Sequence, residues 1–182
     1  MRLKARKNSV VCAVIALLAS ATGAAALEER FEDLSASVEV AGVFGVDVTQ
    51  TSLTFTNVSQ NKTTILGEGS FYNQVKCRSN YGRRWYLKAQ LIELRHTSTN
   101  RTLPVSALKW KIVGSTGSGQ PSGSRGDFQA FSQEPSVIYE SQGDDNRGRE
   151  VALQFQYSLT PPSSSLAGTY VGQIIFTMVE AP

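Results

Sequence analysis

Apolar and polar residues alternate along most of this chain with a repeat of two residues. In the segment 38–48 the even positions are almost all apolar, while Ser37, Glu39 and Asp47 occupy the other face. Such alternation is typical of a β-strand that has one buried and one exposed side. The same pattern recurs in the segments 53–55, 71–77, 85–91, 108–112, 137–139, 151–159 and 170–178. It predicts eight or nine strands separated by polar turns.

Strands with one apolar side can bury it only by packing two sheets face to face. We therefore expect an all-β protein, with a single antiparallel, immunoglobulin-like β-sandwich over residues 36–182. Trp85 and Trp110 follow the apolar alternation and are expected in its core. The glycine- and serine-rich stretch 114–127 contains no apolar run and is expected to form a mobile surface loop.

The amino terminus has the composition of a secretory signal. Basic residues up to Lys7 precede the apolar stretch 10–18, and small residues end the segment at Ala24-Ala25-Ala26. This order predicts a signal helix over 1–26 that is cleaved between Ala26 and Leu27. The apolar stretch is too short for a membrane anchor, which needs about 20 apolar residues. The acidic residues 27–35 would then form a lead-in, and we expect a secreted, periplasmic or cell-surface protein without a later transmembrane segment.

Signal removal changes the charge and the cysteine count. It takes four of the 18 basic residues and leaves 14 against 15 acidic residues, so the mature surface is nearly neutral. Such a surface gives no electrostatic reason to bind nucleic acid. Cys77 is the one cysteine left, which excludes an intrachain disulfide. It alternates with Phe71 and Val75 and is expected on their buried face, although an intermolecular disulfide or reactive thiol remains the alternative.

Residues for catalysis or metal binding are few. His96 is the one histidine, and we interpret it as an exposed residue near a strand end. No serine-hydrolase elbow, zinc-protease motif or zinc-type cluster is present, so no catalytic residue, cofactor or metal site is predicted. Asp144 and Asp145 form the one adjacent acidic pair of the polar turn 141–148. They are interpreted as a solvated turn, with a calcium site or a ligand-contact surface as alternatives.

Exposed aromatic side chains are the remaining candidates for ligand binding. Tyr81 precedes a predicted strand, and Tyr86 lies on the face opposite to Trp85. Flat aromatic rings of this kind stack on sugars in carbohydrate-binding modules. Tyr81 and Tyr86, together with the polar loops 114–127 and 141–148, the second of which contains Asp144 and Asp145, would form the contact surface for a polysaccharide.

Three stretches resemble families of exported bacterial proteins. The stretch Val46–Val58, which contains Leu53-Thr-Phe-Thr-Asn-Val58, resembles the opening L-x-F-x-x-V strand pair of pilin-like and spore-coat-U-like domains. Trp85-Tyr-Leu87 is similar to the motif of WxL cell-surface domains, and Leu166-Ala-Gly-Thr-Tyr170 is similar to the last strands of immunoglobulin-like surface domains. The pilin-like resemblance implies subunits that assemble into fibres or coats, sometimes by lending an amino-terminal strand to a neighbour. It implies no catalytic residue.

The absence of a catalytic pattern favours a non-enzymatic structural or adhesive protein of the cell surface. We expect it to self-associate, or to bind other surface proteins, through an exposed sheet edge, with residues 36–48 as the donor or edge strand. A carbohydrate-binding module is the alternative function.

Overall fold

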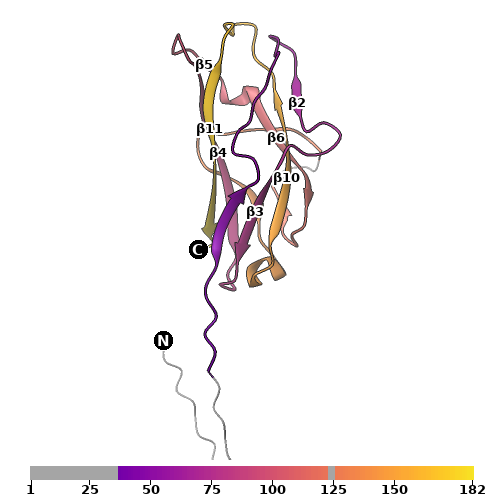
Figure 1. The fold of residues 1–182 in the computed structure, drawn as a ribbon, viewed down its shortest axis with the longest axis vertical. Helices are drawn as coiled ribbons and strands as arrows, with labels where there is room; N and C mark the ends of the chain where they lie inside the picture. Colours follow the sequence, from indigo (N-terminus) through magenta and orange to yellow (C-terminus); the bar gives the residue numbers. More distant parts are fainter. Residues whose placement is uncertain (1–36, 123–125) are drawn as a thin grey trace, which may run out of the picture. The chain divides into compact units, whose positions relative to one another are not determined.

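The chain folds into two antiparallel β-sheets that pack face to face (Figure 1). The computed structural model describes residues 37–122 and 126–182. The predicted signal, its cleavage site at Ala26 and Leu27, and the lead-in 27–35 lie outside the described residues. Residues Val40–Pro182 form one compact unit. The predicted antiparallel β-sandwich is confirmed, with eleven strands in the described residues rather than eight or nine.

The first sheet has the order β1-β3-β10-β6-β8, and β2 also pairs with β10. Its strands are β1 (Phe44–Val48), β2 (Thr64–Leu66), β3 (Asn73–Ser79), β6 (Leu108–Ser115), β8 (Gln129–Ala130) and β10 (Val151–Leu159).

The second sheet has the order β11-β4-β9-β7, and β5 also pairs with β4. Its strands are β4 (Trp85–His96), β5 (Thr102–Leu103), β7 (Gln120–Pro121), β9 (Ser136–Glu140) and β11 (Tyr170–Glu180). Two short 3₁₀ helices, η1 (Val105–Ala107) and η2 (Gly143–Arg147), complete the described elements. β1 and β8 are therefore the outer strands of the first sheet's order, and β11 and β7 are those of the second.

The core lies between the inner faces of the long central strands. Trp85, Leu87 and Leu91 of β4 are fully buried, and alternate residues of β10 such as Leu153 and Phe155 are buried in the same core. Each such side chain contributes about 1.5–3 kcal/mol through its removal from water. The predicted core positions of Trp85 and Trp110 are confirmed.

The strand predicted at 53–55 does not form, although its side chains behave as predicted. Leu53 and Phe55 pack against the core, but residues 49–63 contain no strand. Asn57 has a left-handed φ of 55°, which interrupts the extended conformation after a few residues. Alternation reports which side of a segment is buried, and it does not report whether the backbone pairs with a neighbour. This segment lies along the edge of the sandwich without joining either sheet.

The predicted burial of Cys77 is confirmed, because its side chain is fully buried within β3. Burial, with a smaller contribution from the nearby Asp47 carboxylate, raises the pKa of the thiol to about 12. The thiol is therefore protonated and shielded from oxidants at neutral pH. The prediction that Phe71 shares this buried face is wrong: β3 begins only at Asn73, and Phe71 is 36% exposed.

Candidate functional site

An uncharged groove runs along the open edge of the sandwich, between β11 and the segment 48–60. It consists of two adjoining cavities of about 620 and 550 Å³. Leu53, Thr54, Leu94, Tyr170 and Val171 line both of them, so the cavities form one continuous groove. In the part of the chain that the structure describes, no strand pairs with the outer edge of β11.

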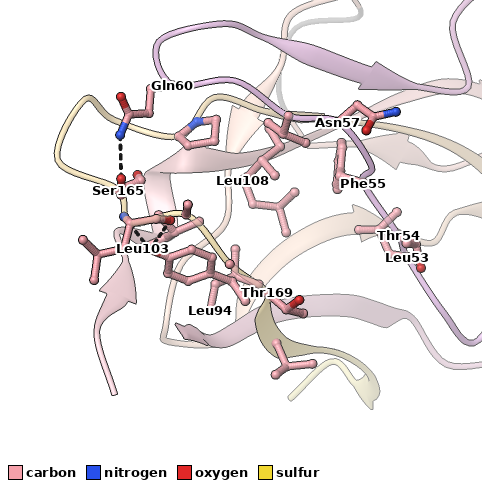
Figure 2. A pocket seen from close by; sticks show the side chains of 18 residues that line it. Leu53, Thr54, Phe55, Asn57, Gln60, Leu94, Leu103, Leu108, Ser165 and Thr169 are labelled. Atoms are coloured by element: carbon pink, nitrogen blue, oxygen red, sulfur yellow. Dashed lines mark hydrogen bonds between the residues drawn. The ribbon is translucent and has the colours of Figure 1, made fainter. Parts of the chain in front are cut away.

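The lining of this groove mixes apolar and uncharged polar side chains, and its apolar part reaches the core. Figure 2 shows Leu53 and Phe55 on the amino-terminal segment at one side, and Leu94, Leu103 and Leu108 on the strands across from it. None of the residues that line either cavity is Asp, Glu, Lys, Arg or His. An uncharged groove with apolar side chains at its base, beside an unpaired sheet edge, fits an extended peptide, because the edge offers backbone hydrogen bonds and the groove accepts alternate side chains.

The loop 165–170 forms one rim of the groove. The Gln60 side chain donates a hydrogen bond to the carbonyl of Ser165 over 2.6 Å, as Figure 2 shows. The Tyr170 hydroxyl accepts a hydrogen bond from the backbone N–H of Leu166 at 3.0 Å and lies 3.2 Å from its carbonyl. These contacts tie the rim to the segment 48–60 on one side and to the start of β11 on the other.

Exposed residues precede β1. Residues 37–43 form no strand and are all exposed, with Val38 at 85% and Val40 at 79%. At the end of this segment the Asn80 side chain donates to the carbonyl of Ala41 over 2.8 Å and accepts from the N–H of Val43 over 2.7 Å. Of residues 37–48, the described part of the predicted donor segment 36–48, residues 44–48 alone form a strand of the chain's own sheet.

The four residues predicted as a ligand surface have different surroundings. Tyr81 is 53% exposed and stacks on Phe44, with ring centroids 6.2 Å apart. Tyr86 is half-buried on β4, where it pairs with Val179 and Glu140. Asp144 is exposed in η2, as a solvated turn requires. Polysaccharide binding by Tyr81, Tyr86 and Asp144 stays a prediction, whereas Asp145 does not belong to this surface.

The prediction of a solvated turn is wrong for Asp145, whose side chain is fully buried. Its carboxylate accepts four hydrogen bonds: from the backbone N–H groups of Ser118 (2.9 Å), Gly119 (2.8 Å) and Gln142 (3.2 Å), and from the hydroxyl of Tyr139 (2.7 Å). Burial raises the pKa of Tyr139, and the hydrogen bond to Asp145 raises it further. Asp145 thus joins η2, β9 and the stretch 116–119.

The prediction that all of 114–127 forms a mobile loop is also wrong, because hydrogen bonds to the buried Asp145 hold part of this stretch. Asp145 fixes Ser118 and Gly119, and β7 pairs with β9 directly afterwards. Gly119 lies so close to the carbonyl of Glu140 that a methyl group at this position would collide with it. The glycine that suggested flexibility is required here by close packing.

The prediction that His96 is exposed is also wrong. It is 6% exposed at the end of β4, and Tyr170 packs edge-on against its ring at 5.0 Å. The groove itself was not predicted from the sequence. Most of its lining comes from two long uncharged stretches, between Asp47 and Lys62 and between Glu150 and Glu180, and this distribution of charge is the signal that could have located it.

Comparison with known proteins adds no relative. No protein-family model matches the sequence, and no curated protein matches it. Within residues 37–122 and 126–182, no group of three or more His, Cys, Asp or Glu residues could hold a metal ion. Over the same ranges, none of the helices has the length and apolar character needed to cross a membrane.

Proposed function

We propose that the protein is a non-enzymatic structural or adhesive subunit that associates with further copies of itself through the edge of β11. The uncharged groove beside this edge carries the proposal. A groove without charged residues can be covered by an apolar segment without leaving a charge unpaired. An unpaired edge strand offers backbone donors and acceptors that an added strand satisfies.

The occupant of the groove in this proposal is the exposed segment 37–43 of a second copy. Val38 and Val40 project to the same side of an extended chain, and Glu39 projects to the other. Both valines could enter the groove while Glu39 stays in water. Their burial would contribute about 1.5–3 kcal/mol each, in addition to the backbone hydrogen bonds along β11.

Export completes the proposal, because fibres or coats form outside the cytoplasm. The predicted signal 1–26, cleaved between Ala26 and Leu27, would deliver the chain to the periplasm or the cell surface. With Cys77 buried and its thiol protonated, assembly would depend on packing and hydrogen bonds rather than on an intermolecular disulfide.

Truncation of the amino terminus tests the proposal. We expect the chain from Leu27 to self-associate in sedimentation experiments, and the chain from Ala41 to bind itself at least about a hundredfold more weakly, since two buried valines are lost. The chain from Ser35 is the matched control: it lacks the acidic lead-in but retains Val38 and Val40, and it should associate as the chain from Leu27 does. Equal association of all three chains, or none in any of them, would rule out this function.

A further inference from the structure

His96 connects the body of the second sheet to the rim of the groove. It is the one histidine of the chain and the last residue of β4. Its backbone N–H donates to the carbonyl of Arg101 over 2.7 Å, and its ring is buried against the rim loop. A methyl group on Gly168 would collide with this ring, so the loop lies directly on the imidazole.

The hydrogen bonds of the ring define its protonation state. The backbone N–H of Ser98 lies 3.1 Å from Nδ1 and can only donate, so Nδ1 must be an unprotonated acceptor. Nε2 lies 3.0 Å from the carbonyl of Ala167, which can only accept, so Nε2 carries the proton. The structure therefore contains a neutral imidazole in which both nitrogens are satisfied.

A second proton would break this arrangement. It would have to bind at Nδ1, where it would face the N–H of Ser98, and this amide would lose its acceptor. In the described segments packed against the ring, 97–102 and 165–170, the ionisable side chains are Arg101 and Tyr170. Neither is a carboxylate that would stabilise an imidazolium, and the neighbouring Arg95 is paired with Glu93 on β4 itself.

The rim depends on this ring at several points. Ala167 is bound to it directly, and Tyr170 packs edge-on against it. The N–H of Thr97, the next residue along the chain, donates to the carbonyl of Thr169 over 3.0 Å. Ala167, Thr169 and Tyr170 all line the groove, so a displaced imidazole would change the shape of the groove wall.

We propose that His96 makes the groove sensitive to pH: protonation of its ring releases the rim loop 165–170 and weakens the association of copies. This inference rests on the proposed function. Histidine side chains change their charge between about pH 5 and 8. A rim that forms only around the neutral ring takes up one proton when it is released. Lowering the pH should therefore lower the association constant, by at most about tenfold for each pH unit.

Hydrogen exchange measures the rim independently of association. In the chain from Leu27, without a histidine tag, amides of 165–170 should lose at least about tenfold of their protection between pH 8 and pH 5, after correction for intrinsic rates. His96→Gln is the matched variant, because its amide can donate to Ala167 and accept from Ser98 but does not titrate. Its rim protection should be the same at both pH values.

The outcomes separate this inference from the proposed function. Rim protection that does not change with pH in the wild-type chain overturns the inference, whatever the state of association. A pH-dependent rim in a protein that never self-associates supports the switch and contradicts the proposed function. Should His96→Gln fail to fold, the NMR titration of the single imidazole replaces it: rim exchange must follow that titration curve, and a rim that changes at another pH refutes the inference.

Discussion

Replacement of Asp145 by alanine should lower the free energy of unfolding by about 3–5 kcal/mol. The carboxylate is fully buried and accepts hydrogen bonds from three backbone N–H groups and from the hydroxyl of Tyr139. Asp145→Ala removes this acceptor from the buried Tyr139 hydroxyl and from the part-buried N–H groups of Ser118, Gly119 and Gln142, and each buried donor left unsatisfied costs about 1–3 kcal/mol. Removal of one member of a buried charged pair lowers the free energy of unfolding by a similar amount.

Chemical denaturation followed by tryptophan fluorescence measures this effect, since the Trp85 indole donates to the carbonyl of Asp145 over 3.2 Å. Asp144→Ala is the matched control, because its neighbouring carboxylate is exposed and the change should stay within about 0.5 kcal/mol. Equal stability of the two variants would show that the carboxylate of Asp145 does not hold η2 and the stretch 116–119 together.

The replacement Val171→Asp should abolish association while the subunit remains folded. Val171 lines both cavities of the groove and is 59% exposed, so the fold does not need its side chain buried. A strand added to β11 would cover the new carboxylate, and the guanidinium of Arg95, its cross-strand neighbour on β4, is already paired with Glu93. Desolvation of an unpaired charge costs several kcal/mol, so the association constant should fall more than about a hundredfold.

Val113→Asp provides the control for this experiment. Val113 lies on β6, is 44% exposed and does not line the groove, so its replacement introduces the same charge elsewhere on the surface. Sedimentation equilibrium should show association for Val113→Asp and none for Val171→Asp, with both variants melting near the temperature of the wild-type chain. Equal weakening by both would mean that the added negative charge, and not the groove, controls association.

The sequence predicts the two-sheet fold because alternation is a local property. In β4 and β10 the residues next to each position in the sequence are enough to indicate which side of the strand is buried, because β-strands have a fixed repeat of two. The same rule fails at 53–55, where the side chains are half-buried but Asn57 ends the extended run and no strand pairs with the backbone. Pairing depends on which edges are available, and that is a property of the whole fold.

Polar residues were harder to place, because their surroundings come from distant parts of the chain. Asp145 sits in a sequence with the composition of a solvated turn, yet its partners Ser118 and Gly119 are more than 25 residues away. His96 likewise meets Ala167 only through the pairing of β4 with β11. A buried polar residue requires partners, and alternation carries no information about them.

A cross-linking experiment between two copies tests the central claim most directly. One isotopically labelled chain carries Val40→Cys and an unlabelled chain carries Val171→Cys, and both retain the buried Cys77. If the segment 37–43 of one copy lies along β11 of another, mild oxidation of the mixture should yield mainly the disulfide between residues 40 and 171 of different copies. If the 40–40 and 171–171 disulfides formed as fast as the mixed 40–171 disulfide, this result would contradict strand addition at the groove.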